Sequence, residues 1–375
     1  MAEQRTKFNA NNTGYIKGRY NLFCDEQLGL ADTINVTYPK LDSLYQKQVS
    51  QIWNEFEVDL TQDRMDMTTL PYSIVRPMQQ TISWQALADA VAARSISSLL
   101  MKHITNPELE NLVNLWAFFE TIHNKTYAHI IKKTFEDPQE MMRDTYENAQ
   151  VLMRSESIVR AFDKLEQLAD DAPILEVKTT LLTAMVALFA LESIAFMASF
   201  AVTFGIAELG VFQGISQLVT LICRDEILHT HMGLEVMSTL RDEEGWGPIF
   251  AICQGQVLEM LTELTQQEMD WADHIFIDGA IPGLSATLLK QEVAYRAYPT
   301  FQFFGLGDDF PFEIVKEPPL KYMSKYLNTS NIQVAAQELQ LTAYQIGIIS
   351  DNAQEYVFDE ADLMLDLKPG MLINY

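Results

Sequence analysis

The chain has 375 residues, of which 48% are hydrophobic, so it can bury a sizeable core. Its formal net charge of -25 argues against nucleic acid and anionic membrane surfaces as direct partners, because both require a basic face. The 3 cysteines form no CxxC pair, which argues against a disulfide framework or a zinc-thiolate site. The N-terminal segment lacks the apolar run of a signal peptide, so we expect a reducing, cytoplasmic setting.

The first part of the chain predicts an extended arm followed by helices. Residues 1–40 are polar and interrupted by glycine, so we expect little regular structure there. Pro71 and Pro77 are expected to break the segment before the second helix, whereas Asn106 and Pro107 predict the start of the third. Helical periodicity predicts helices over residues 41–60, 80–103, 106–135, 139–169, 173–210, 212–240 and 248–277.

One of these helices is apolar enough to resemble a membrane span. Between Thr179 and Gly210 the only charged residues are Glu192 and Glu208. They leave uncharged runs of 13 and 15 residues, shorter than the roughly 18–20 that a span needs. An acid inside such a run must be protonated, paired or bound to a metal. The pattern therefore predicts a buried helix that carries one functional carboxylate, Glu192.

Strand-like alternation is scarce, so we predict an all-α fold. Residues 305–320 are rich in proline and glycine, and a short helix fits 319–328. Residues 351–375 carry six acids and several large apolar side chains. They are either a solvated, disordered tail or a peptide that docks on a partner. We divide the chain into an N-terminal arm (1–40), a helical metal-binding domain (41–330) and a C-terminal tail (331–375).

Two of the six histidines follow an acid by three residues. Glu120 and His123 form one pair, and Glu226 and His229 form the other. Residues three apart on a helix share a face, so each pair can point both side chains at one site. Acids are frequent in this chain, and such pairs alone are therefore a weak signal.

The spacing of two further acids makes the signal stronger. Asp89 lies 31 residues before Glu120, and Glu192 lies 34 residues before Glu226. Each spacing suits one helix with a lone acid followed by an antiparallel helix with Glu-x-x-His. Both lone acids have apolar neighbours, where an unpaired carboxylate is costly. The alternative is a set of unrelated surface acids and core histidines. We interpret the pattern as a ferritin-like bundle with a two-metal centre, whose predicted ligands are Asp89, Glu120, His123, Glu192, Glu226 and His229.

The predicted ligands also constrain the metal. Two divalent ions would balance the four carboxylates, and oxygen and imidazole ligands suit iron or manganese. Tyr127 lies seven residues after Glu120 and shares its helix face. Phe196, Phe200 and Phe204 follow at steps of four, a stripe typical of a core that would also keep water from a reactive centre.

Two other residues have ordinary interpretations when taken alone. Trp53 is typical of a packing residue. Asp225, directly before Glu226, is either a solvated acid or a hydrogen-bond acceptor for a ligand histidine.

Together, these motifs resemble the small, radical-generating subunit of class I ribonucleotide reductase over roughly residues 45–350. The segments that carry the resemblance are Trp116–His123 followed by Tyr127, Leu191–Ile194 followed by Phe196 and Phe200, and Arg224–His229. Segments Glu268–Asp273 and Asn331–Val334 are similar to the family but less specific.

The resemblance implies an activity and a set of roles. The six ligands would bind two iron ions, with manganese left open, and the centre would use O2 to form a stable tyrosyl radical on Tyr127. Phe196, Phe200 and Phe204 would form an apolar pocket around the radical.

The resemblance also implies a route out of the centre and a partner. Trp53, linked through Asp225 to His123, would relay an oxidising equivalent, and Tyr344 with Glu338 would pass it on. The C-terminal tail would dock on a large catalytic subunit that reduces ribonucleotides for DNA replication. A homodimer is expected. The substrate's phosphorylation state, the need for an activase and the identity of the large subunit stay open.

Three alternatives are weighed against this interpretation. A di-iron oxygenase or desaturase uses the same ligands but does not need Tyr127, Trp53 and Tyr344 together. A ferritin-like storage protein is usually shorter and does not need an acidic tail. A purely structural bundle does not explain two buried acids at matched spacings.

Overall fold

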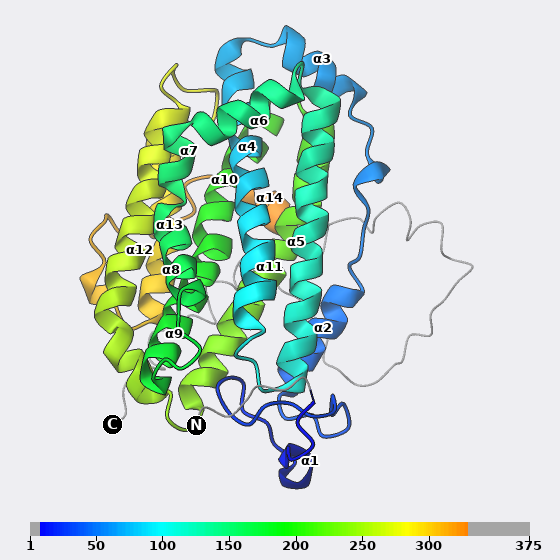
Figure 1. Cartoon of the computed structure of the whole chain (residues 1–375). Helices are drawn as coiled ribbons and strands as arrows, with labels where there is room; N and C mark the ends of the chain where they lie inside the picture. The colour runs from blue at the N-terminus through cyan, green and yellow to red at the C-terminus, as the bar shows by residue number, and fades with distance from the viewer. Residues whose placement is uncertain (1–7, 329–375) are drawn as a thin grey trace.

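The structure, a computed structural model, describes residues 8–328, and the described residues form a bundle of helices (Figure 1). The long helices lie side by side along one axis, with α3 at one end of the bundle and α1 at the other. Within the described residues, β-type pairing is limited to the isolated bridges Phe23–Ile104 and Ile281–Leu284. The predicted all-α, ferritin-like class is confirmed.

The body of the bundle is made of six long helices. They are α4 (Tyr72–Ser95), α5 (Pro107–Thr134), α9 (Ile174–Ala190), α11 (Gln213–Asp242), α12 (Gly247–Ile275) and α13 (Ala286–Phe303). Shorter helices complete the bundle. They are α1 (Gly14–Lys17), α2 (Pro39–Val49), α3 (Thr61–Thr69), α6 (Pro138–Glu147), α7 (Ala149–Arg154), α8 (Glu156–Glu166), α10 (Met197–Ala207) and α14 (Met323–Leu327). All except α10, which continues α9 through the core, cover the ends and edges of the bundle. Single turns of 3₁₀-helix lie at η1 (Glu55–Glu57) and η4 (Gly307–Asp309).

The apolar helix predicted over 173–210 is the central element of the core. It runs as α9, a π-helical turn η3 (Leu191–Phe196) and α10, and it spans 34 residues. By length and composition this helix passes as a membrane span, yet 89% of its most apolar window is buried inside the protein. The prediction of a buried core helix is therefore confirmed. A second π-helical turn, η2 (Ile96–Leu100), continues α4. Such turns are rare and often lie at functional sites.

The N-terminal arm packs on one end of the bundle. Its residues Leu22 and Phe23 are buried, and the Leu22 N–H donates to Glu243 Oε1 at 2.8 Å. Only the single turn α1 is regular within the described part of the arm.

Several predicted helix limits agree with the structure, and others are wrong. The helices predicted over 106–135, 212–240 and 248–277 correspond to α5, α11 and α12, and Asn106 caps α5 by accepting from Leu109 N at 2.8 Å. The helix predicted over 41–60 ends at Val49, because Asn54 starts a new turn by capping η1.

Two further helix predictions are wrong. Pro77 does not break the helix but lies inside α4. Its missing N–H leaves the Ser73 carbonyl without a helical partner, and Ser73 is only half-buried. The segment 139–169 is three helices, not one, because Asn148 caps α7 and Ser155 separates α7 from α8.

Candidate metal centre

Four helical segments bring acids and histidines to one place in the core. α4 contributes one acid, η3 contributes one acid, and α5 and α11 each contribute a Glu-x-x-His pair on one face. All six side chains are 0% exposed: Asp89, Glu120, His123, Glu192, Glu226 and His229. The structure therefore gathers the complete set of predicted ligands.

The six residues form two overlapping groups of four. Asp89 and His123 belong to one group, Glu192 and His229 belong to the other, and Glu120 and Glu226 belong to both. Within each group the candidate ligand atoms lie within 4.8 Å of one another. Two shared carboxylates between two outer acid–histidine pairs are the arrangement of a di-metal centre.

The histidine rings are oriented for this role. His123 Nδ1 lies 2.9 Å from Glu226 Oε1, and His229 Nδ1 lies 2.8 Å from Glu226 Oε2. The opposite nitrogens face other side chains: His123 Nε2 lies 3.3 Å from Asp225 Oδ2, and His229 Nε2 lies 2.6 Å from Gln48 Nε2. A partner on the second nitrogen fixes the tautomer and leaves Nδ1 as the ligand atom.

Gln48 was not predicted from the sequence. It is fully buried on α2, and its Oε1 atom has no hydrogen-bond partner. If the two ends of its amide are exchanged, the oxygen accepts the Nε2–H of His229, so two donors no longer face each other. The available signal was a polar side chain four residues after Leu44 on the apolar face of a helix.

The unpaired oxygens provide a direct test of whether this site fits metal ions. Buried acceptors without donors are costly, so native proteins rarely leave them. Here five buried carboxylate oxygens have no hydrogen-bond partner: Asp89 Oδ1 and Oδ2, Glu120 Oε2, and Glu192 Oε1 and Oε2. Two divalent cations would satisfy them, and the residues therefore fit a di-metal centre.

The electrostatics of the metal-free site follow from burial and crowding. Burial raises the pKa of Asp89 well above its usual value, and the charges of Glu120 and Glu226 raise it further. Burial disfavours the charged form of His229, but the carboxylates of Glu226 and Glu120 outweigh it and raise the pKa to about 9. Burial also opposes ionisation of Glu226, yet the two imidazoles hold its pKa low. Without metal, the raised pKa values of Asp89 and His229 favour their protonated forms, and bound cations would displace those protons.

A hydrogen-bonded path leaves the site through Asp225. Trp53 Nε1 donates to Asp225 Oδ2 at 2.6 Å, and the same oxygen lies 3.3 Å from His123 Nε2. Arg224 Nε donates to the other oxygen of Asp225 at 3.2 Å. The Trp53 ring also stacks on His123, with centroids 6.2 Å apart. Trp53, Asp225 and His123, far apart in sequence, are therefore in contact.

Trp116 also contacts the site, a contact that the sequence analysis did not identify. Its Nε1 donates to Glu120 Oε1 at 2.8 Å, and its ring stacks on His229 with centroids 5.0 Å apart. The sequence feature that could have predicted this contact is the position of Trp116 four residues before Glu120, on the same helix face.

Tyr127 is fully buried, and its hydroxyl has no hydrogen-bond partner. Burial raises its pKa well above the usual value, and Asp89 is the nearby charge that raises it most. Phe196, Phe200 and Phe204 are buried in an end-to-end stack, with centroids 5.8 and 6.1 Å apart. That this stack forms the pocket around Tyr127 stays a prediction. Tyr344 and Glu338 lie outside the described residues.

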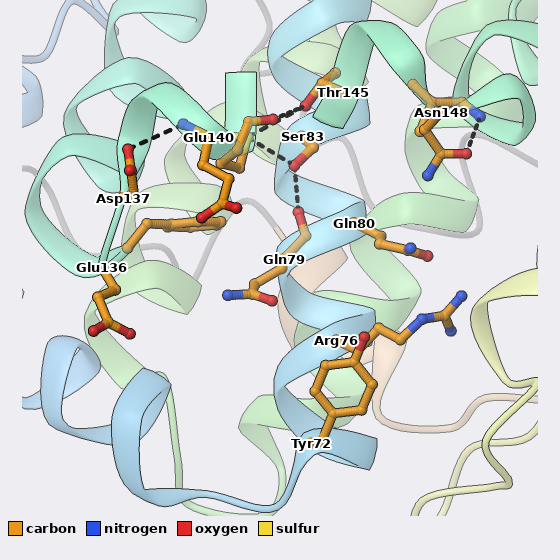
Figure 2. Close-up of a pocket in the computed structure, with 13 residues that line it drawn as sticks. Tyr72, Arg76, Gln79, Gln80, Ser83, Glu136, Asp137, Glu140, Thr145 and Asn148 are labelled. Atoms are coloured by element: carbon orange, nitrogen blue, oxygen red, sulfur yellow. Dashed lines mark hydrogen bonds between the residues drawn. The ribbon is translucent and has the colours of Figure 1, made fainter. Parts of the chain in front are cut away.

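A separate pocket of about 330 Å³ lies near the start of α4. Its lining includes Tyr72, Arg76 and Gln79 of α4 and Glu136 and Glu140 near the α5–α6 junction, all labelled in Figure 2. None of the six candidate ligands lines this pocket. It is therefore distinct from the candidate metal centre.

Comparisons with known proteins agree with this geometry. The family described as "Ribonucleotide reductase, small chain" matches residues 31–318. The Escherichia coli O157:H7 protein "Ribonucleoside-diphosphate reductase 1 subunit beta" is 32% identical over 348 residues, covering 88% of this chain and 92% of the relative.

Solved structures show the same fold. The ribonucleotide reductase R2 subunit from Clostridium botulinum superposes with a TM-score of 0.76 at 20% identity, covering 86% of this chain and 98% of that one. The dimanganese(II)-NrdF structure from Streptococcus sanguinis has a TM-score of 0.62 at 18% identity, covering 80% and 99%. With its matched family, its relatives and its paired Glu-x-x-His helices, the chain belongs to the ribonucleotide reductase small-chain family.

Proposed function

We propose that this chain is the small subunit of a class I ribonucleoside-diphosphate reductase, with Asp89, Glu120, His123, Glu192, Glu226 and His229 as its metal ligands. The observation that carries the proposal is the pair of ligand groups that share Glu120 and Glu226. When bound there, two iron or manganese ions would supply the O2-activating chemistry. The E. coli relative is named a reductase beta subunit, and the S. sanguinis protein is named a dimanganese protein.

The residues beside the ligands have assigned tasks in this proposal. Tyr127 gives up an electron and its phenolic proton and becomes the stable radical. A base at the loaded centre would take up this proton, because neither the Tyr127 hydroxyl nor Asp89 makes a hydrogen bond in the metal-free structure. The fully buried position of Tyr127 excludes water and reductants from the radical.

The path through Asp225 carries the oxidising equivalent out. Trp53 exchanges an electron with the centre while its N–H bond to Asp225 holds the proton in place. Tyr344 and Glu338 continue the relay toward the large subunit, on which the tail (331–375) docks. The substrate is reduced on that partner. Membership of the family implies this partner and a dimer of small subunits, and we place the enzyme in the cytoplasm.

The oxygenase or desaturase alternative is not favoured. The relatives that this chain matches over nearly their whole length are reductase subunits.

The deciding experiment is electron paramagnetic resonance after Fe(II) and O2 are added to metal-free protein, with Tyr127→Phe beside it. The proposal expects a tyrosyl signal near g = ~2 in the wild type, because a phenoxyl radical is a single unpaired spin, and no such signal in the variant. The same assay is repeated with Mn(II). A bound metal pair that yields no radical under either loading contradicts the assignment of Tyr127.

A further inference from the structure

A buried ion pair contacts η3, the π-helical turn that carries the candidate ligand Glu192, without belonging to the candidate metal centre. Arg154, at the end of α7, donates from Nε to Glu268 Oε1 at 2.7 Å and from Nη2 to Oε2 at 2.6 Å. Both side chains are 0% exposed. Nη2 also donates to Ser199 Oγ at 2.7 Å and to the Ala195 carbonyl at 3.1 Å. Charges are costly to bury, and apolar replacements often serve stability equally well. Stability alone therefore does not account for this pair.

The guanidinium lies between two tryptophan rings. The Arg154 Cζ atom is 3.5 Å from the centroid of the Trp84 ring and 4.8 Å from that of Trp271. Trp84 in turn packs on Phe196, with centroids 5.4 Å apart, and Phe196 follows the candidate ligand Glu192 by four residues. Trp84 also precedes Asp89 by five residues on α4. An easily oxidised indole therefore lies on the helix that carries Asp89 and contacts the π-helical turn that carries Glu192.

Two tryptophans near the site have opposite electrostatic surroundings. The N–H of Trp53 donates to a carboxylate, Asp225 Oδ2, at 2.6 Å. The N–H of Trp84 donates to a neutral hydroxyl, Ser155 Oγ, at 3.0 Å, and a cation covers its ring. Loss of an electron makes an indole positive. A neighbouring anion stabilises that charge, whereas a guanidinium in a low-dielectric interior opposes it strongly.

We propose that Arg154 protects Trp84 from one-electron oxidation and so keeps oxidising equivalents on Tyr127 and Trp53. The opposed reaction moves one electron from the Trp84 ring to the oxidant and leaves an indole cation radical whose N–H proton would pass toward Ser155 Oγ. The Glu268 carboxylate binds the N–H edge of the Arg154 guanidinium, so the ion pair has no net charge. The face of the guanidinium lies over the Trp84 ring, so the positive end of the pair is the end nearest the indole. Arg154 is thus a positioning residue whose effect passes through Trp84. The inference takes its natural oxidant from the proposed function.

The test measures Trp84 oxidation in metal-free, full-length protein. Photogenerated tris(bipyridine)ruthenium(III) serves as a one-electron oxidant, and peptide mass spectrometry quantifies oxidised Trp84. Trp246, which has its own cation neighbour in Lys178, is the internal reference. The neutral double variant Arg154→Gln, Glu268→Gln is compared with two controls. Glu268→Gln keeps the cation, and Arg154→Lys keeps the positive charge but cannot form the two parallel hydrogen bonds to Glu268. Thermal unfolding verifies that each protein is folded.

The neutral double variant should contain about ten-fold more oxidised Trp84 than Glu268→Gln, because these two proteins differ by the unit charge of Arg154 over the ring. It should also contain more than the wild type, in which the positive end of the pair faces the ring. Glu268→Gln, which leaves the cation without its anion, should contain no more oxidised Trp84 than the wild type, and Arg154→Lys should remain near the wild-type level. No increase in the double variant overturns the inference. An equal increase in Glu268→Gln also overturns it, because loosened packing, not charge, would then be the cause.

A second arm links this role to the proposed reaction. With Fe(II) and O2, the double variant should yield less tyrosyl radical per bound metal pair than the wild type, and adding Trp84→Phe should restore the yield. A wild type that binds metal without forming a radical counts against the proposed function. The ruthenium arm contains no metal pair, so it still decides the role of Arg154 in that case.

Discussion

The two candidate ligand histidines differ in the partner of the outer nitrogen, which is a carboxylate for His123 and the Gln48 amide for His229. Replacing Gln48 with leucine removes the group that fixes the His229 tautomer. We expect the affinity for Fe(II) or Mn(II) to fall by roughly 10–100-fold, as is typical for such partners. Calorimetric titration of metal-free protein measures it. Gln46→Leu, on the exposed side of the same helix, is the control and should bind as the wild type.

Asp225 has a different task, because it joins Trp53 to His123. Asp225→Asn keeps the shape but removes the anion that accepts the Trp53 N–H. We expect the Tyr127 radical still to form, while turnover with the large subunit falls by about a hundred-fold or more, the usual cost of a lost proton-transfer partner. Paramagnetic resonance and a turnover assay on the same sample separate the two steps. Unchanged turnover would remove Asp225 from the relay.

At the scale of elements, α3 holds the start of α11. Phe212 N donates to Asp66 Oδ2 and Ile215 N donates to Asp63 Oδ1, both at 2.8 Å, so two acids of α3 cap the helix that carries Glu226 and His229. Gly214 lies at this contact, and a Cβ atom there would lie 2.5 Å from Asp63 Oδ2.

Gly214→Ala should therefore lower the free energy of unfolding by roughly 1–3 kcal/mol, the usual cost of overpacking. The matched change Gly255→Ala, in the exposed part of α12 where a Cβ meets open space, should raise it by roughly 0.5–1 kcal/mol, because alanine restricts the unfolded chain. Urea denaturation of metal-free protein compares the two. Equal effects would show that the α3–α11 contact tolerates the added methyl.

At the scale of the whole molecule, four helical segments meet at one cluster of unpaired carboxylates, so metal binding should stabilise the entire bundle. At a free metal concentration of about 100 times Kd, one site adds roughly 2.7 kcal/mol to the free energy of unfolding. Scanning calorimetry with and without Mn(II), which avoids O2 chemistry, should show a higher Tm when metal is present. Glu226→Gln, which alters a carboxylate shared by both groups, should largely abolish this rise.

The predicted docking tail also belongs to this scale. A synthetic peptide of residues 351–375 should compete with the small subunit for the large subunit and inhibit turnover in a dose-dependent way. A peptide of the same composition in scrambled order is the control. Equal inhibition by both peptides would show a charge effect and count against docking.

Much of this architecture is readable from residue order, because it depends on local periodicity and on the cost of burying charge. α5, α11 and α12 have apolar faces that repeat with the helical period, and the structure places them within a few residues of the prediction. Asp89 and Glu192 were identifiable because an acid in an apolar run requires a partner. The matched spacing to Glu120 and Glu226 then predicted the six residues that the structure gathers.

Features that depend on contacts between distant segments could not be predicted from the sequence. Gln48 and Arg154 have functional interpretations only because other helices bring His229 and Trp84 against them. The π-helical turn at Glu192 and the uninterrupted path of α4 through Pro77 run against local preference. Such departures persist when packing compensates for their cost. Periodicity therefore located the acids along the chain, while helix packing chose the neighbours that tune them.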